Sequence, residues 1–324
     1  MTQLKRFFMI LTMAGCSLGT VGSASAGIII NEPGYVDSAV GIIQTDFGNA
    51  FGAVASSGGV VYSTGAFSEA GLYRFTSNVG TPIASFDNTS LSLQIVGNTA
   101  YVGLEGGHIY AVDLTTNVAT DLGDSGVATA LSLAVAPTGF GGFGGQLIVS
   151  GINQVVAFDP NTSAVTGILS VDGYQAFSGS AFTNDGRLLV AQNLSGEILQ
   201  VGADGSTSLF ATTSEPGAIA VNPNTGDVYV ANELSGTIVH YLADGTLVGD
   251  FASNVSWDGG YYPSMLAFSP DGSALIYGEL NINDHAYGIR QITASTAIPE
   301  PSTWISFTIA GGLAFVFARR RQTT

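Results

Sequence analysis

Apolar and polar residues alternate in short runs along most of this chain, and turns rich in Gly, Asn and Asp separate the runs. The stretch that begins at Gly217, GAIAVNPNTGDVYVANELSGTIVHYLADGTLVGDFAS, contains four such runs. Alternation with a period of two residues predicts half-buried β-strands. The Ser-Gly and Asp-Gly pairs predict tight turns, because Gly and Asp accept positive φ at low cost. The stretch therefore predicts four short antiparallel strands.

The same pattern recurs along the chain. The unit that begins at Gly179 repeats it almost position for position, so that Leu194-Ser195-Gly196 corresponds to Leu234-Ser235-Gly236. Units of about 41 residues with four strands each are typical of β-propeller blades. The sequence therefore predicts an all-β, six-bladed propeller. The four looser copies begin near Gly52, Leu91, Leu131 and Ser264.

The last unit lacks one strand. After Ile289-Arg290-Gln291-Ile292 little of the repeat remains, whereas residues 39–44 form a predicted strand outside any unit. A ring avoids a lone sheet edge when such a strand pairs with the last blade. We expect residues 39–44 to close the ring in this way, within a propeller domain that spans residues 27–297.

Composition and charge limit the classes of function that this chain can have. The chain has 324 residues, of which 46% are apolar, 10% are charged and 44 are Gly, and this content suits short strands and many turns. Residues 27–297 hold three Arg against 23 Asp and Glu, a formal net charge of −20. Such a body repels phosphate, which argues against nucleic-acid binding.

The first 26 residues have the pattern of a secretory signal peptide. Lys5 and Arg6 precede an apolar stretch, and Ala24-Ser25-Ala26 is a cleavage site with small residues at Ala24 and Ala26. We expect cleavage after residue 26. A retained membrane helix and lipidation at Cys16, the only cysteine, are the alternatives.

The C-terminal residues 298–324 have the pattern of a second targeting segment. Pro299-Glu300-Pro301 comes before an uncharged, mostly apolar run at residues 304–318, which as a helix would span roughly 22 Å. This is short of a hydrocarbon core of about 30 Å. The run predicts a single transmembrane helix with the body outside the cytoplasmic membrane, because positive charge favours the cytoplasmic side. The predicted membrane stop is Arg319, Arg320 and Arg321.

This tail resembles the PEP-CTERM sorting segment of Gram-negative bacteria. The Pro-Glu-Pro, the short apolar helix and the Arg cluster occur in that order, with Ile298 where Val is more usual. The resemblance implies export, transient retention in the membrane, and cleavage by an exosortase near Pro-Glu-Pro. It also implies association with bacteria that build exopolysaccharide matrices. A plain membrane anchor is the alternative.

The units at Gly179 and Gly217 resemble NHL and gluconolactonase-type (SMP-30-like) propeller repeats. The resemblance rests on the strings TNDGRLLVAQN and NPNTGDVYVAN and on the SGEI and SGTI turns after them. It is clear for these two units and partial for Ser264 to Glu279. It implies an architecture more than an activity, because propellers include both enzymes and binding platforms.

Polar residues recur where the second strand of each unit ends. A ring would bring these residues to one face, where carboxylates and amides can hold Ca²⁺ or another divalent cation, or hydrogen-bond a sugar. The gluconolactonase resemblance implies such a metal, although a complete ligand set does not align. The alternative is a set of solvated turn residues. The candidates are Glu105, Asn153, Asn193, Asn232, Glu233 and Glu279.

No residue carries a predicted catalytic role. His108, His240 and His285 are isolated, and the chain has no G-x-S-x-G elbow. GFGGFGG at Gly139 contains G-x-G-x-x-G, but a predicted strand follows it instead of a helix, so we interpret it as a hairpin loop.

The leading hypothesis is therefore an exported, non-catalytic propeller that binds or scaffolds in the cell envelope or exopolysaccharide matrix. Its expected partners are an exosortase, the membrane, and polysaccharide or envelope proteins. The alternative is a metal-dependent, SMP-30-like lactonase or related hydrolase on the same ring.

Overall fold

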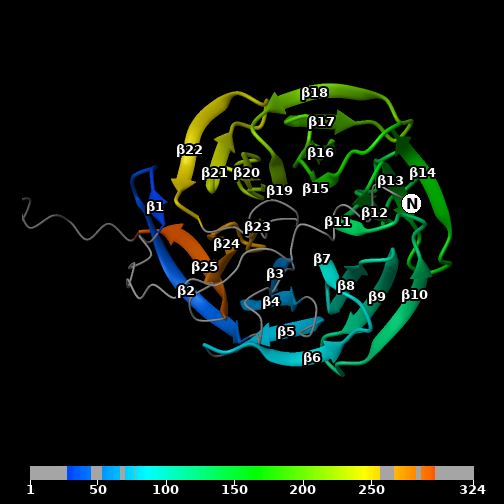
Figure 1. The fold of residues 1–324 in the computed structure, drawn as a ribbon, viewed down its shortest axis with the longest axis horizontal. Coiled ribbons are helices and arrows are strands. Elements are labelled where there is room, and N and C mark those ends of the chain that lie inside the picture. Colours follow the sequence, from blue (N-terminus) through cyan, green and yellow to red (C-terminus); the bar gives the residue numbers. More distant parts are fainter. Residues whose placement is uncertain are drawn as a thin grey trace, which may run out of the picture.

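Six β-sheets surround a central axis like the blades of a propeller (Figure 1). The computed structural model describes residues 28–44, 53–65, 70–76, 78–255, 266–281 and 286–295. Within these residues, all the secondary-structure elements are β-strands. The predicted all-β, six-bladed propeller is confirmed.

Each blade begins at the axis with its first strand and runs outward. Blade 1 contains β3 (Val54–Ser57), β4 (Val60–Gly65), β5 (Gly71–Phe75) and β6 (Thr81–Ser85). Blade 2 contains β7 (Ser90–Val96), β8 (Thr99–Leu104), β9 (His108–Asp113) and β10 (Ala119–Asp124). Blade 3 contains β11 (Ala130–Val135), β12 (Leu147–Gly151), β13 (Gln154–Phe158) and β14 (Val165–Ser170).

The other three blades follow the same order. Blade 4 contains β15 (Phe177–Phe182), β16 (Leu188–Gln192), β17 (Glu197–Val201) and β18 (Thr207–Thr212). Blade 5 contains β19 (Pro216–Val221), β20 (Val228–Asn232), β21 (Thr237–Tyr241), β22 (Leu247–Ser253) and β1 (Ile29–Ile30). Blade 6 contains β23 (Leu266–Phe268), β24 (Ala274–Asn281), β25 (Ala286–Ala294) and β2 (Tyr35–Gln44).

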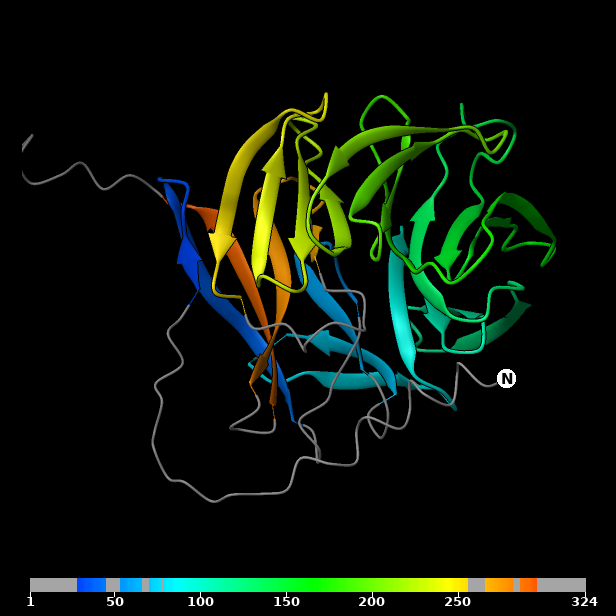
Figure 2. The ribbon, with the colours of Figure 1, turned by 45° about the horizontal axis from the view of Figure 1, so that its top comes forward.

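The N-terminal segment joins three blades. Strand β2 pairs antiparallel with β25 from Tyr35 opposite Ala294 to Gln44 opposite Ala286, so residues 39–44 lie in the outermost strand of blade 6 (Figure 2). Strand β1 pairs with β22 as a fifth strand of blade 5, which the repeat pattern does not predict. Ile42 N–H donates to the Asn78 carbonyl oxygen, and Gly80 N–H donates to the Ile42 carbonyl oxygen, so the segment also contacts blade 1.

The apolar core lies between the blades. Six clusters of buried side chains occupy the six interfaces between neighbouring blades, because alternate residues of a strand point to opposite faces of its sheet. Aromatic side chains contribute to this core. The buried ones include Tyr73, Phe158, Tyr229, Tyr241 and Tyr277, while Tyr110 and Phe268 are half-buried.

Serine side chains on the inner strands add polar links between blades. Ser92 Oγ donates to the Ala130 carbonyl oxygen at 2.8 Å, across the interface of blades 2 and 3. Both the backbone N–H and the hydroxyl of Ser180 donate to Ser132 Oγ, at 2.9 and 3.0 Å, between blades 4 and 3. These bonds fix the inner strands around the axis.

The Gly-rich run at Gly139 is a loop of the β11–β12 hairpin. Gly145 N–H donates to the Ala136 carbonyl oxygen at 2.8 Å, which closes the loop at its base. Phe140 is buried, and its ring meets Phe182 edge-on with centroids 5.0 Å apart. The interpretation as a hairpin loop is confirmed.

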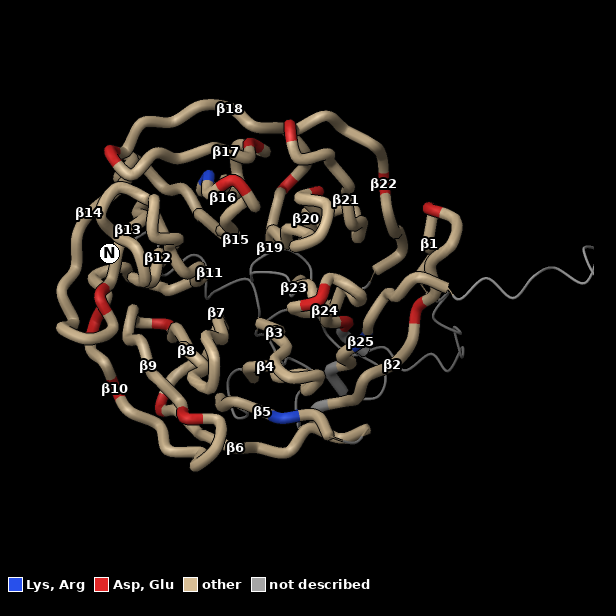
Figure 3. Tube along the Cα trace, turned by 180° about the vertical axis from the view of Figure 1, so that it is seen from behind, with Lys and Arg blue, Asp and Glu red and all other residues tan. Residues whose placement is uncertain are grey.

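Charged residues are few and lie all around the ring. Figure 3 shows acidic residues on every side, with few basic residues among the described ones. In the described part of the chain the basic residues are Arg74, Arg187 and Arg290.

Candidate functional site

The upper face is the face of the ring at which the inner strands begin and the second strands end. Antiparallel order sends each second strand back toward the start of the first, so residues after β8, β12, β16 and β20 reach this face. Five of the six candidate residues lie at these strand ends, and two of them form a direct contact.

Asn193 and Glu233 form a buried polar pair between blades 4 and 5. Asn193 Nδ2 donates to Glu233 Oε2 at 3.2 Å and to the Pro216 carbonyl oxygen at 3.3 Å. The two residues are 9% and 6% exposed, respectively. A carboxylate removed from water is stabilised by such a donor. The buried Glu233 carboxylate is therefore stabilised by the Asn193 amide. The spacing of the two residues in the sequence does not predict this contact.

This pair connects to the central channel. The Pro216 carbonyl oxygen also accepts a hydrogen bond from Ser178 Oγ at 2.7 Å. Ser178 lines the channel, so one carbonyl group joins the channel wall to Asn193. The upper face and the channel are thus linked through β15 and β19.

Asn153 and Asn232 have structural contacts. Asn153 adopts a positive φ of 65°, and its Oδ1 accepts the Gln175 backbone N–H at 2.7 Å. Asn232 Nδ2 donates to Thr213 Oγ1 at 3.2 Å. Both amides fasten the loops that lead to inner strands.

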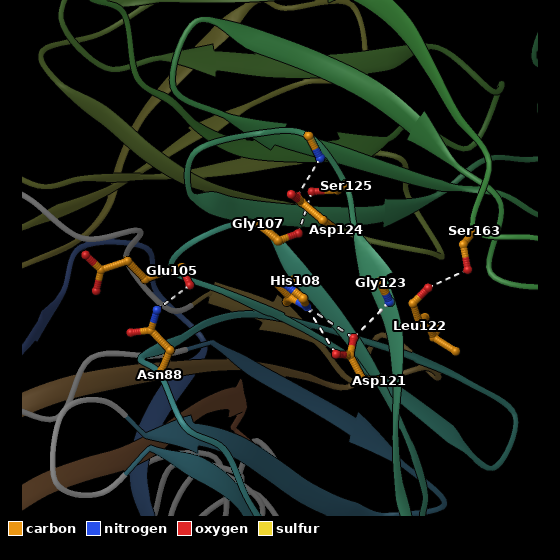
Figure 4. A network of polar contacts seen from close by, with 11 residues as sticks. Asn88, Glu105, Gly107, His108, Asp121, Leu122, Gly123, Asp124, Ser125 and Ser163 are labelled. Atoms are coloured by element: carbon orange, nitrogen blue, oxygen red, sulfur yellow. Dashed lines mark hydrogen bonds and ion pairs between the residues drawn. The ribbon is translucent and has the colours of Figure 1, made fainter.

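Glu105 is exposed at the end of β8. Its carbonyl oxygen accepts a hydrogen bond from Asn88 Nδ2 at 2.6 Å (Figure 4), and its backbone bridges to Thr129 of the next blade. These contacts come from the backbone of Glu105.

The position predicted for Glu279 is wrong. The residue lies within β24, opposite Gly288, because the β24–β25 hairpin extends to Asn281. Glu279 Oε2 is 3.5 Å from Arg290 Nε. Burial raises the pKa of Glu279, and Arg290 opposes this shift. Glu279 therefore belongs to the charge cluster of the closing blade.

The six candidates do not fit a divalent-metal centre. Such a centre needs several oxygen donors directed at one point. The side chain of Glu279 is directed to Arg290, Asn153 and Asn232 bind loop groups, and Asn193 presents its amide nitrogen to Glu233. Within the described ranges, no three His, Cys, Asp or Glu side chains are arranged to hold a metal ion.

Two histidines lie on third strands, His108 on β9 and His240 on β21, and each contacts a carboxylate of another segment. His108 Nδ1 lies 3.1 Å from Asp121 Oδ2 on the surface of blade 2 (Figure 4). His240 is 8% exposed, stacks on Tyr229 with ring centroids 4.4 Å apart, and lies 2.6 Å from Glu32 Oε1. Glu32 lies between β1 and β2, so this contact helps to fix the N-terminal segment. His285 lies outside the described residues.

The ring encloses a central channel of about 460 Å³. All six inner strands contribute to its wall, and the described lining residues carry no charged side chain. The wall consists mostly of Ala, Leu, Ile, Val and Phe side chains, with serines and one glutamine among them. Its polar side chains are Ser56, Ser92, Gln94, Ser132, Ser178, Ser180 and Ser269.

The predicted signal peptide and the predicted C-terminal sorting segment lie outside the described residues. Within the described part of the chain, no helix is long and apolar enough to cross a membrane. The predicted residues concerned are Ala24, Ala26, Pro299, Glu300, Pro301, Arg319, Arg320 and Arg321, together with the helix at residues 304–318.

Comparisons with known proteins identify the tail and the fold separately. Residues 297–322 match the PEP-CTERM protein-sorting motif. No curated protein matches the sequence significantly. A structural genomics protein of unknown function from Bacteroides thetaiotaomicron is similar, with 12% identity, a TM-score of 0.61, and coverage of 80% of this chain and 76% of that one.

Two further structures have names that describe an activity or a ligand. One is a putative gluconolactonase, with 12% identity, a TM-score of 0.59, and coverage of 82% of this chain and 93% of that one. The other is regucalcin, a calcium-binding protein from Agrobacterium tumefaciens, with 14% identity, a TM-score of 0.57, and coverage of 79% and 94%. The chain thus combines a PEP-CTERM sorting motif with a six-bladed β-propeller similar in fold to gluconolactonase-type and regucalcin-type proteins.

Proposed function

We propose that this protein is an exported, non-catalytic β-propeller that binds or scaffolds components of the cell envelope or the exopolysaccharide matrix. The single observation that carries the proposal is the sorting motif at residues 297–322, directly after the last blade. The motif implies export and recognition by an exosortase, and the rigid ring supplies a platform. Residues 1–26 act as a cleaved signal peptide, and residues 304–318 as a temporary membrane tether.

The test follows the full chain in a Gram-negative host that contains an exosortase. In wild-type cells, the body is expected outside the cytoplasmic membrane, where added protease reaches it, and a shorter form accumulates at the surface. Changing Pro299, Glu300 and Pro301 to Ala should leave the uncut chain in the membrane fraction. A body that stays protected in the cytoplasm would overturn the proposal.

The alternative, a metal-dependent lactonase, has support from the shared fold but not from the donor set. Its discriminating test is thermal unfolding of the full chain with millimolar Ca²⁺, Mn²⁺ or Zn²⁺, together with an assay of sugar-lactone hydrolysis. We expect neither stabilisation nor turnover, because the candidate donors in the described part of the chain are not directed at one point. A metal-dependent rise in both would favour the lactonase.

A further inference from the structure

The central channel differs in chemistry from the rest of the molecule. The body of the protein is strongly acidic, yet the described wall of the channel contains only neutral side chains. Burying an ionised group against such a wall would cost several kcal/mol, because no opposite charge compensates it. A ligand of this channel is therefore neutral.

The size and apolar content of the channel favour a small molecule. A volume of about 460 Å³ lies within the range of roughly 300–1,000 Å³ that is typical of ligand pockets. Apolar side chains come from facing blades, so a bound molecule would contact them on several sides. They include Ile95, Leu133, Phe182, Val221 and Phe268.

Hydroxyl groups in the wall retain hydrogen-bonding capacity. Ser132 Oγ accepts both the N–H and the O–H of Ser180, so the Ser132 hydroxyl hydrogen is left for another acceptor.

Two further serines present acceptors. Ser92 and Ser178 each donate their hydroxyl hydrogen to a backbone carbonyl of the next blade, which leaves oxygen lone pairs available. The wall thus offers a donor at the half-buried Ser132 and acceptors at Ser92 and Ser178. Hydroxyl groups match both kinds of partner, because a hydroxyl can donate and accept.

We propose that the central channel binds a small, neutral, largely apolar molecule that carries one or two hydroxyl groups. This inference deepens the proposed binding function, on which it rests. It assigns the site to the channel and gives the class of ligand, and it needs no metal or ionised side chain.

The test uses a matched pair of probes on the full chain in mild detergent. 2-Naphthol is neutral at pH 7, whereas naphthalene-2-sulfonate has the same apolar body with a permanent negative charge. Binding to the folded state raises the melting temperature in proportion to the logarithm of ligand concentration over Kd. We expect 2-naphthol to raise it and naphthalene-2-sulfonate to leave it unchanged.

Three variants locate the binding site. Ala134→Trp fills the channel and should abolish the rise, whereas Leu209→Trp, at an exposed position of β18, should retain it. Ser132→Ala removes the hydroxyl hydrogen that is left for another acceptor and should weaken 2-naphthol binding by roughly three- to tenfold. If Ala134→Trp fails to fold, Ser132→Ala still tests the site.

The inference is overturned if 2-naphthol gives no rise, if both probes act alike, or if the Ser132→Ala and Ala134→Trp proteins respond like wild type. None of these results depends on export, which cell fractionation measures separately. Failure of the channel proposal can therefore be distinguished from failure of the proposed function.

Discussion

Arg290 Nε donates to Asp37 Oδ2 across 3.0 Å and joins residues that are 253 positions apart in the sequence. Tyr277 Oη donates to the same carboxylate at 2.9 Å. Asp37 lies on β2, while Arg290 and Tyr277 lie on β25 and β24. The charge cluster thus fastens the N-terminal strand to the last blade at the point where the ring closes.

Asp37→Asn should lower the free energy of unfolding by about 2 kcal/mol, because the partly buried Arg290 loses the nearer of its two charged partners. Urea unfolding of the full chain at neutral pH measures the change. Asp121→Asn is the matched control, since Asp121 and His108 are 42% and 48% exposed, and exposed pairs contribute about 1 kcal/mol or less. Equal losses in the two variants would contradict this role.

The turn aspartates should make the fold acid-sensitive. Hydrogen bonds from the Ser269 hydroxyl, followed by those from the Ser273 backbone N–H and hydroxyl, lower the pKa of Asp271 to about 2 from 3.8. The folded state therefore favours the carboxylate. This stability is complete above about pH 4 and is lost as the pH falls through about 2.

Thermal unfolding from about pH 5 to about pH 2 checks this dependence. Asp271→Asn should flatten the acid limb of the stability curve. Asn222→Asp should steepen it, because Asn222 Oδ1 accepts the Asn224 N–H at 2.9 Å in a similar turn. Parallel curves for wild type and both variants would refute the assignment.

Gly107 should be intolerant of any side chain. It has a φ of +85°, and an added Cβ would overlap the Val127 carbonyl oxygen. Gly97 also has a positive φ, of +57°, but faces open space. Both Gly→Ala changes incur a backbone cost of about 1–2 kcal/mol. Gly107→Ala should be destabilised by at least about 1 kcal/mol more, since the backbone must move. Similar melting temperatures would disprove the close approach.

Asn193→Asp should convert the buried pair into two neighbouring carboxyl groups. Because like charges at this distance cannot both ionise at low cost, one pKa rises and the variant becomes less stable at neutral pH. Its stability should recover as the pH falls. Asn98→Asp is the control: Asn98 contacts Asp113 at 3.4 Å, but in solvent. Urea unfolding at two pH values should show a larger pH effect for Asn193→Asp.

The number of blades was predictable because its determinants are local. Each blade is marked by apolar alternation and by turn residues within about 41 positions. The unit at Gly217 forms β19 to β22, and its Asp-Gly turn has Gly245 at a φ of +89°. The tail is equally local, since Pro299-Glu300-Pro301 and the residues after it match the sorting motif without reference to the ring.

The candidate site was predictable only in part. The end of each second strand follows from the repeat, so Asn193 and Glu233 were correctly placed on neighbouring strand ends. Their hydrogen bond depends on how blades 4 and 5 pack, which no local pattern encodes. Glu279 was misplaced because the last hairpin is longer than the repeat suggests.

The sequence by itself determined the strand periodicity, the six repeats and the sorting motif at residues 297–322, because each depends on neighbouring residues. The tertiary structure alone decided that β1 joins blade 5, that Asp37 meets Arg290, and that Glu32 reaches His240. It also decided that serines and apolar side chains surround a neutral channel. These features form where the first and last strands meet, or where the six blades meet at the axis. They depend on contacts between residues far apart in the sequence, which a local repeat pattern does not encode.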